Sequence, residues 1–297
     1  MDAFSLASVA VILASLAIGA VKRFTLTYVL ILGNLVVFFL TILSFGAYGP
    51  GTLSPVQAEL GFRPTYLTSG GALFTLFTHM FVHSTIAHVI VNMLFLFLIG
   101  AYLESKIGKA RFAAVYVVAG LAGVLLEALV QWGSGVLIVG ASGAISGAMG
   151  ALLILYPKDE TPMFLGPLFL PRVPVWISVG SWFAIQVVMV FLDSGPVAYS
   201  AHIGGFLAGV VVGLATTIPR ATTAVAYAVG ELEPLATTPE LRDALDKIRG
   251  EKEKDVRRAW LEYFADRAKC PRCDSKMSVE GDRLICECGY AVEVGRA

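Results

Sequence analysis

A serine and a histidine stand near the starts of two separate apolar segments of this chain. Ser142 lies in the run Gly140-Ala141-Ser142-Gly143, and His202 follows much later. A serine hydroxyl is a weak nucleophile until a neighbouring imidazole removes its proton. The two residue types therefore predict nucleophilic catalysis, with Ser142 as the nucleophile and His202 as its base, provided that the two segments meet.

Attack on an amide also creates an oxyanion, which needs hydrogen-bond donors such as backbone N–H groups, His or Asn at fixed positions. His88 and Asn92 lie four residues apart near the start of a third apolar segment, so they share one face of a helix. Polar side chains inside a membrane are costly, and they tend to face the protein interior and mark function. Four such residues at a similar depth favour a catalytic site.

Each of these signals has a simpler interpretation when it is taken alone. A glycine-rich run around a serine is more often helix packing than catalysis, and a single membrane histidine is more often a proton or hydrogen-bond partner. His79 and His83 have the spacing of a metal pair, but neither an HExxH motif nor an acidic ligand accompanies them. No acid stands beside His202, and the nearest candidate is Asp193 across a loop. We therefore expect a dyad rather than a triad.

The composition identifies the elements that must position these side chains. The 297-residue chain is 57% hydrophobic and only 15% charged, with a mean hydropathy of +0.76. A soluble protein cannot bury that much apolar surface, so long apolar runs must cross a membrane as helices. Seven segments are long enough to span or nearly span the bilayer, of which the fifth is the shortest: 3–21, 24–45, 84–103, 111–131, 140–156, 174–192 and 200–218.

Small residues would allow the segments that carry Ser142 and His202 to touch. The segment of His202 carries a glycine at every fourth position: Gly205, Gly209 and Gly213. The segment of Ser142 continues the serine's face with small residues: Ser146 and Gly150. Residues of this size and spacing let membrane helices approach closely, which can bring a nucleophile and its base within hydrogen-bond distance.

Basic residues predict the orientation, because short loops rich in Lys and Arg stay in the cytoplasm. They lie in alternate connections and after the last segment: Lys22, Arg23, Lys106, Lys109, Arg111, Lys158, Arg172 and Arg220. The opposite loops hold Arg63 and no lysine. We expect a multi-pass cell-membrane protein with its N-terminus outside and its C-terminal tail in the cytoplasm. Segment 3–21 is expected to be an anchor, with a cleaved signal peptide as the alternative, because its basic pair follows the apolar run.

Most of the charges lie after the last apolar segment, which predicts a small soluble tail. Within it, Thr238-Pro239-Glu240 has the order of a helix start, with Thr as the N-cap and Pro in the first turn. We expect a charged helix from there to about Arg267. The formal net charge of zero gives no indication of nucleic-acid binding, and no nucleic-acid partner is predicted.

All four cysteines lie in this tail, where Cys270-Pro271-Arg272-Cys273 is followed by Cys286-Glu287-Cys288. Four thiolates from two such pairs suit tetrahedral Zn²⁺ and resemble a zinc ribbon, although the second pair is one residue closer than in the usual CxxC. Two disulfides are the alternative, and a cytoplasmic location argues against them. We expect a structural zinc bound by Cys270, Cys273, Cys286 and Cys288, and no cofactor for catalysis.

In combination and in this order, the motifs resemble the rhomboid family of intramembrane serine proteases. Three runs carry the resemblance: His79-Met80-Phe81-Val82-His83 with His88 and Asn92 after it, Gly140-Ala141-Ser142-Gly143-Ala144, and Ala201-His202-Ile203-Gly204-Gly205. Three further residues near the end of the third segment are similar to that family: Gly100, Glu104 and Gly108.

The resemblance implies an all-α polytopic membrane protein with a six-helix core at 24–219 and an added transmembrane helix at 1–23. It implies that Ser142 is the nucleophile, that His202 is the base, and that His88 and Asn92 help to hold the oxyanion. Its substrates would be membrane proteins whose transmembrane segments unwind near the outer face of the bilayer. After the core we place a linker with a charged helix at 220–268. A zinc-ribbon-like module follows at 269–297, and the sequence does not name its cytoplasmic partner.

Two positions depart from the family pattern. Many relatives have an aromatic residue four positions after the serine, where this chain has Ser146, and Trp-Arg before the histidine-rich run, where it has Phe74 and Thr75. Neither change removes a catalytic group, but they bear on how His202 is held and on how the loop before the histidine-rich run packs. Two other functions compete with proteolysis. One is an inactive relative that binds or escorts membrane clients, and the other is a transporter, for which inverted repeats and mid-membrane charges are missing.

Overall fold

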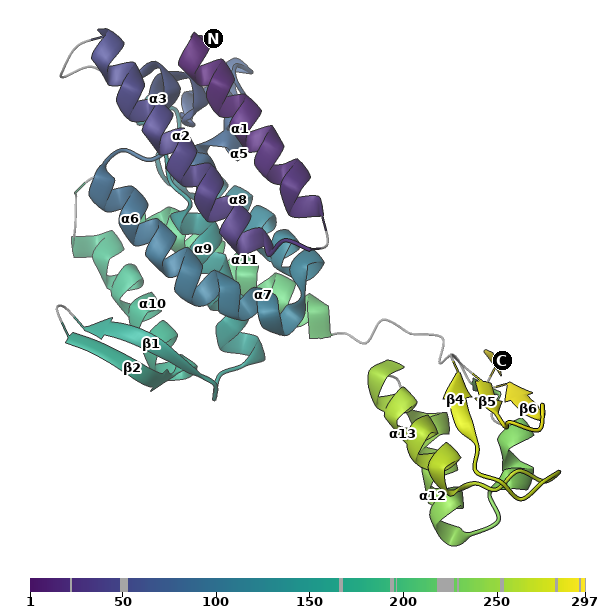
Figure 1. Cartoon of the computed structure of the whole chain (residues 1–297). Coiled ribbons are helices and arrows are strands. Elements are labelled where there is room, and N and C mark those ends of the chain that lie inside the picture. Colours follow the sequence, from purple (N-terminus) through teal and green to yellow (C-terminus); the bar gives the residue numbers. More distant parts are fainter. Residues whose placement is uncertain are drawn as a thin grey trace. The chain divides into compact units, whose positions relative to one another are not determined.

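The seven apolar segments predicted from the sequence are all helical in the computed structural model (Figure 1). The third is one continuous span made of α6, the π-helical turn η2 and α7. The bounds are α1 Ala3–Ala20, α2 Leu26–Tyr48, α6 Ile86–Phe95, η2 Leu96–Gly100, α7 Ala101–Ile107, α8 Lys109–Val130, α9 Ser142–Leu155, α10 Val175–Leu192 and α11 Tyr199–Thr217.

The structure describes residues 1–297 except 22, 49–52, 166–167, 193–194, 196, 218–226, 229, 252–253, 281–282, 294 and 297. It divides into two units, Met1–Ile218 and Pro219–Ala297. Three residues used in the sequence analysis lie outside the described residues: Lys22, Asp193 and Arg220.

Five of the described helices are long and apolar enough to cross a membrane, and they run over Ala3–Ala20, Leu26–Phe45, Ile86–Ile107, Lys109–Val130 and Val175–Leu192. The helix α9 is shorter, with 14 residues. At 1.5 Å per residue it is about 21 Å long, less than the ~30 Å of a hydrocarbon core. On its own, α9 is therefore too short to cross the hydrocarbon core.

Glu104 near the C-terminal end of the third span ties that span to α2. Its carboxylate accepts hydrogen bonds from the backbone N–H groups of Leu26 and Thr27, both at 2.8 Å, and from the Thr27 hydroxyl at 2.7 Å. The first N–H groups of a helix have no partner within the helix, so this buried acid satisfies two of them. Gly108 follows with φ +79, a conformation that favours glycine, and allows the chain to turn from α7 into α8.

The connections contain more regular structure than the sequence predicted. The loop 46–83 holds four short helices: α3 Pro55–Leu60, α4 Thr65–Ser69, α5 Thr75–Thr78 and the 3₁₀ turn η1 His79–Phe81. Between α9 and α10, β1 (Glu160–Leu165) and β2 (Leu168–Pro174) form an antiparallel hairpin. Thr161 in β1 hydrogen-bonds with Ser178 of α10 at 2.9 Å, so the hairpin is joined to the start of that helix.

The close contact of α9 with α11 depends on glycines, as the small-residue stripes predicted. A Cβ at Gly205 would overlap the carbonyl oxygen of Gly143, and one at Gly209 would overlap that of Gly147. The backbones themselves therefore touch, which only residues without a side chain permit. The helix α8 also packs on both, and Figure 1 shows α9 and α11 behind the span of α6 and α7.

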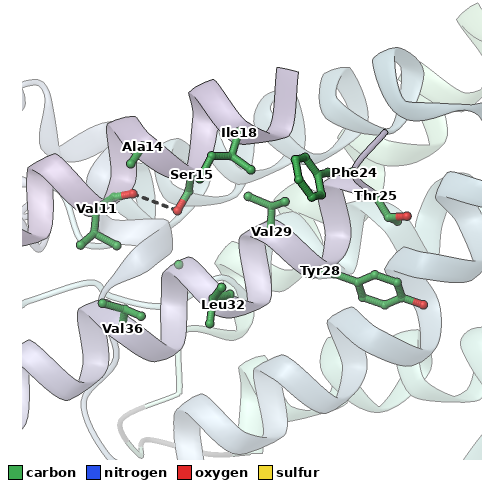
Figure 2. A pocket seen from close by; sticks show the side chains of 11 residues that line it. Val11, Ala14, Ser15, Ile18, Phe24, Thr25, Tyr28, Val29, Leu32 and Val36 are labelled. Carbon is green, nitrogen blue, oxygen red and sulfur yellow. Dashed lines mark hydrogen bonds between the residues drawn. The ribbon is translucent and has the colours of Figure 1, made fainter. Parts of the chain in front are cut away.

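The first helix, α1, lies against α2 and leaves an apolar cavity of about 450 Å³ between them (Figure 2). Ser15 is the polar side chain of α1 in the wall, and its hydroxyl donates to the carbonyl oxygen of Val11 at 2.9 Å. A Cβ at Gly33 would overlap the Ser15 hydroxyl, so a small residue on each helix fixes their approach. The helix α1 is thus packed on α2 through small residues.

In the second unit, the predicted helix start is confirmed, because the Thr238 hydroxyl accepts a hydrogen bond from the N–H of Leu241. The expectation of one helix up to Arg267 is wrong. The segment forms α12 (Pro239–Gly250) and α13 (Lys254–Arg267), because Glu251 after Gly250 takes an extended conformation and ends the first helix. Glycine is a poor helix former, which favours a break at this position.

The two tail helices share one core with the cysteine-rich strands. The strands are β4 Ser278–Glu280, β5 Arg283–Ile285 and β6 Ala291–Glu293 in one antiparallel sheet, with β3 Tyr227–Ala228 paired to β7 Gly295–Arg296 and the 3₁₀ turn η3 at Gly230–Leu235. The shared core includes Leu232, Leu245, Ile248, Phe264, Met277, Leu284 and Val292. The linker with its helices (220–268) and the zinc-ribbon-like module (269–297), which the composition separates, therefore stabilise each other.

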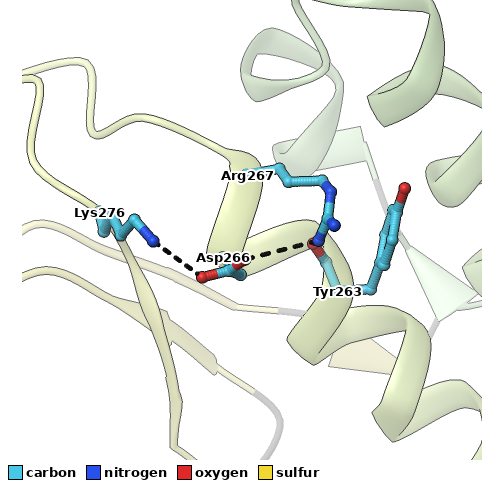
Figure 3. A network of polar contacts seen from close by, with 4 residues as sticks. All are labelled: Tyr263, Asp266, Arg267 and Lys276. Atoms are coloured by element: carbon cyan, nitrogen blue, oxygen red, sulfur yellow. Dashed lines mark hydrogen bonds and ion pairs between the residues drawn. The ribbon is translucent and has the colours of Figure 1, made fainter.

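A polar cluster joins the end of α13 to the segment before β4 (Figure 3). The carboxylate of Asp266 pairs with the ammonium of Lys276 at 3.1 Å, which lowers the pKa of Asp266, and with Arg267 at 3.5 Å. The Arg267 guanidinium lies over the Tyr263 ring at 3.8 Å. Exposed pairs of this kind contribute little stability.

The glycine contact between α9 and α11 yields a stability prediction. We expect Gly209→Ala to lower the thermal unfolding midpoint of the detergent-purified protein, because the new methyl group meets a backbone carbonyl that cannot rotate away. Overpacking of this kind costs roughly 1–3 kcal/mol. The control is Gly180→Ala on α10, where a Cβ would meet nothing within 4 Å. Equal midpoints for the two variants would contradict the contact.

Candidate active site

Ser142 and His202 form a hydrogen-bonded pair at the starts of two touching helices. Ser142 is the first residue of α9, and His202 lies in the first turn of α11. The Ser142 hydroxyl oxygen and the His202 Nε2 atom are 2.9 Å apart. Both residues are partly exposed. This is the distance at which an imidazole can take a proton from a serine hydroxyl.

The turn that leads into Ser142 depends on Gly140. Its φ is +122, which residues with a side chain rarely adopt, and its N–H donates to the carbonyl oxygen of His79 at 2.9 Å. A Cβ at this position would lie 2.7 Å from Nε2 of His88. The glycine therefore allows the His88 ring to approach the backbone beside the serine.

His88 and Asn92 occupy the first turns of α6. The Nδ1 atom of His88 and the hydroxyl of Ser84 are 3.0 Å apart, and the side-chain amide of Asn92 donates to the carbonyl oxygen of His88 at 3.0 Å. Asn92 is buried, whereas His88 is partly exposed. His83 packs edge-on against His88 with ring centroids 4.9 Å apart. Among the described residues neither ring nitrogen of His83 has a hydrogen-bond partner.

The other side of His202 faces a residue that sequence reasoning missed. Its Nδ1 atom is 2.7 Å from the side-chain oxygen of Gln186 on α10. Trp182, one turn earlier on α10, and Tyr199 on α11 place their rings 6.0 and 6.1 Å from the imidazole. The signal in the sequence was a glutamine within the apolar segment 174–192, since polar residues in such segments tend to have partners inside the protein.

The two departures from the family pattern now have structural descriptions. The hydroxyl of Ser146 donates to the carbonyl oxygen of Ser142 at 2.6 Å within α9, and the residue is buried in the helix packing. Aromatic contacts to His202 come instead from the rings on α10 and α11. Thr75 is buried and bonds the carbonyl oxygen of Ala72 at 2.6 Å, while Phe74 is half exposed.

The start of α11 is also fixed from α8. The carboxylate of Glu127, which is buried, accepts a hydrogen bond from the N–H of Ala201 at 3.3 Å. An acid at a helix N-terminus satisfies a free N–H group and interacts favourably with the helix dipole. Since Ala201 precedes His202, the contact fixes the backbone that carries the histidine.

The four cysteines of the tail come together as the sequence predicted. Their sulfur atoms all lie within 4.8 Å of one another, with 3.6 Å between Cys270 and Cys288 and 3.4 Å between Cys273 and Cys286. A disulfide would need about 2.05 Å, whereas four thiolates at about 2.3 Å from one ion are separated by nearly 4 Å. The cluster can therefore hold a metal ion, and Gly289, which follows the second pair, has a φ of +83 that favours glycine.

Comparison with known proteins gives concordant matches. The model of the rhomboid domain matches residues 70–218. The rhomboid protease GluP of Bacillus subtilis is 30% identical over 198 residues, which are 66% of this chain and 36% of that protein. RHOMBOID-like protein 5 of Arabidopsis thaliana is 32% identical over 170 residues, covering 55% of this chain and 50% of the relative. The chain thus spans between about a third and a half of the length of these relatives.

Proposed function

The chain belongs to the rhomboid family, and on this basis we propose that it is an intramembrane serine endopeptidase. It cuts transmembrane segments of other membrane proteins near the outer face of the bilayer. The observation that carries the proposal is the 2.9 Å contact between the Ser142 hydroxyl and the His202 imidazole. A relative that only binds or escorts membrane proteins has no need for such a contact.

The proposed reaction is acyl transfer in two halves. His202 Nε2 takes the proton of Ser142 as the serine oxygen attacks the carbonyl carbon of the scissile peptide, and the carbonyl electrons move to oxygen. The oxyanion collapses, the C–N bond breaks, and His202 gives its proton to the leaving amine. Water then attacks the acyl-serine while His202 accepts the water proton. Collapse of the second oxyanion breaks the bond to the serine oxygen, returns that proton to Ser142 and releases a carboxylic acid, which then ionises in water.

Three donors are assigned to the oxyanion. The N–H of Ser142 stands at the start of α9, where N–H groups lack a partner within the helix. The ring of His88 approaches Gly140 with Nε2. We assign the tautomer in which the Ser84 hydroxyl donates to Nδ1 of His88, so that Nε2 carries the ring proton. Asn92 supplies an amide proton from the same helix face. Donors held at fixed positions need not reorganise when the negative charge develops, so they are worth more than donors in water.

The depth of the site supports the choice of substrate. A peptide bond within a membrane helix is shielded by its own hydrogen bonds, so a substrate must unwind before a serine can attack it. The site stands at the start of a helix too short to span alone, where water can reach it from the outer side. Transmembrane segments with helix-breaking residues near the outer face fit these conditions.

The mechanism predicts that Ser142→Ala and His202→Ala each abolish cleavage, and that the double variant loses no more than either single variant. Nucleophile and base act as one unit, so their losses do not add. The measurement is cleavage of a single-pass substrate, with helix-breaking residues near its outer end, in reconstituted liposomes.

Ser146→Ala is the matched control for this experiment. It changes a serine on the same helix whose hydroxyl bonds the backbone of that helix, so we expect substantial activity. Normal cleavage by Ser142→Ala would refute the serine-protease mechanism. A dead Ser146→Ala with an active Ser142→Ala would mean that the other serine is the nucleophile.

For the tail we propose a structural zinc ion held by four thiolates. All four ligand positions would be filled by protein, which is typical of sites that stabilise a fold rather than catalyse. Because the cysteine-rich strands share a core with α12 and α13, the ion would stabilise the tail as a whole. The role of the tail toward a cytoplasmic partner is not assigned.

Elemental analysis of the purified full-length protein should find about one zinc per chain. We expect Cys273→Ser to lose most of this zinc, because three thiolates hold the ion less tightly than four. Cleavage by the membrane unit should persist in this variant, since no catalytic step uses the metal. Absence of zinc from the wild-type protein, or an unchanged content in Cys273→Ser, would contradict the site.

The proposed orientation places α4 outside and the tail inside the cell. All four cysteines of the chain lie in the tail. If the tail is inside the cell, an impermeant thiol reagent cannot reach them, so the wild-type protein should stay unlabelled in intact cells. Ser69→Cys, at an exposed position of α4, should be labelled under the same conditions. Labelling of the wild-type tail in intact cells, or protection of position 69, would reverse the orientation.

A further inference from the structure

Gln186 makes a contact with His202 to which the proposed dyad gives no role. The dyad uses only the Nε2 atom of the imidazole, whereas the side-chain oxygen of Gln186 is 2.7 Å from the Nδ1 atom. We propose that Gln186 is a positioning residue that fixes the tautomer and ring orientation of His202. The inference rests on the proposed function, since it concerns how the base of that reaction is prepared.

A neutral imidazole carries its proton on either nitrogen, and only one tautomer is a base toward Ser142. If Nδ1 carries the proton, Nε2 has a free lone pair that accepts the proton of the serine hydroxyl. An amide oxygen is an acceptor and cannot donate, so a partner oxygen at 2.7 Å requires the proton on Nδ1. The two contacts then form one chain, from the hydroxyl of Ser142 through the imidazole to the carbonyl of Gln186.

The surroundings of His202 contain other polar and aromatic groups, but none described takes this role. Ser142 contacts Nε2, and Trp182 and Tyr199 contribute ring faces and edges. The nearby carboxylate of Glu127 bonds the backbone N–H of Ala201. In the described part of the chain, Gln186 is therefore the residue that hydrogen-bonds to Nδ1 of His202. An acid occupies this position in a Ser-His-Asp triad.

The place of Gln186 on α10 also argues for a specific role. The side chain is 8% exposed, while its neighbour Ile185 on the same helix is 51% exposed. A buried amide in an apolar helix is costly unless it is hydrogen-bonded, so the contact with His202 satisfies a group that packing alone would not favour. Phe183 stacks on Phe206 at 4.0 Å, one turn beyond His202, and so holds α10 in register with α11.

A neutral amide differs from the acid of a triad in what it can supply. It orients the imidazole, but it adds no negative charge to stabilise the imidazolium that forms during the reaction. Loss of the amide should therefore reduce turnover by less than loss of a triad acid. Because Gln186 acts on the base and not on the substrate, the effect should fall on kcat rather than on KM.

The test compares variants that remove or keep the acceptor. Gln186→Leu removes it, and we expect kcat in liposomes to fall by about five- to tenfold, the size of one hydrogen bond, with KM nearly unchanged. Gln186→Glu keeps an oxygen acceptor and should restore kcat to within about threefold of wild type. Ser178→Ala, which removes the buried hydrogen bond between α10 and Thr161, is the matched control and should keep wild-type kcat.

A spectroscopic readout separates positioning from packing. The chain has four histidines, so ¹⁵N-histidine labelling gives few signals, and His202→Ala assigns the one of interest. We expect the wild-type His202 signal to show the proton on Nδ1 and the Gln186→Leu signal to show a mixture of tautomers. Gln186→Met, which keeps the side-chain length, replaces the leucine variant if that variant does not fold.

Two results would overturn the inference. One is a kcat equal to that of the wild type in folded Gln186→Leu, or in Gln186→Met where that variant replaces it. The other is an equal loss in Gln186→Leu and Gln186→Glu with an unchanged tautomer, which would show that Gln186 only packs. Ser142→Ala, measured alongside, separates the two proposals. If it still cleaves, the proposed function fails and the inference with it; if it is dead while Gln186→Leu is normal, the inference alone fails.

Discussion

The backbone contact between α9 and α11 is the constraint on which the proposed active site depends. Lipid tails are as apolar as the side chains, so no hydrophobic force drives these two helices together, and a close fit must do so. Gly205 and Gly209 supply that fit by lying against backbone carbonyls of α9. The same approach sets the 2.9 Å between Ser142 and His202, because each lies within the first turn of its helix. The close approach of α9 and α11 is therefore required both for helix packing and for the contact between Ser142 and His202.

Buried polar groups complete this arrangement at the helix ends. The carboxylate of Glu104 accepts hydrogen bonds from the first N–H groups of α2. The carboxylate of Glu127 accepts one from the N–H of Ala201 at the start of α11. In a bilayer an N–H group without a partner is costly, so an acid from a neighbouring helix both satisfies it and fixes the position of one helix relative to the next. The backbone that carries His202 is therefore fixed by two neighbouring helices. Glu127 contacts it from α8, and the glycine contacts join it to α9.

Much of the fold and the site could be predicted because each signal depended on local spacing. Apolar length predicted the seven membrane segments, glycine spacing predicted the contact of α9 with α11, and the two cysteine pairs predicted the sulfur cluster. The hairpin at 160–174 was missed because its pairing is between strands, and the break after Gly250 because one glycine within a charged helix is a weak signal. Gln186 was missed because only the packing of α10 on α11 reveals which nitrogen it reaches.

The central claim is that Ser142 is activated by His202 at the start of a close-packed pair of helices. It is tested most directly by labelling the purified protein with a fluorophosphonate, which forms a covalent bond to an activated serine, and by locating the label with mass spectrometry. The account predicts a label on Ser142 in the wild-type protein and little or none in His202→Ala, with folding verified for both. A label on another serine, or equal labelling of Ser142 without His202, would contradict it.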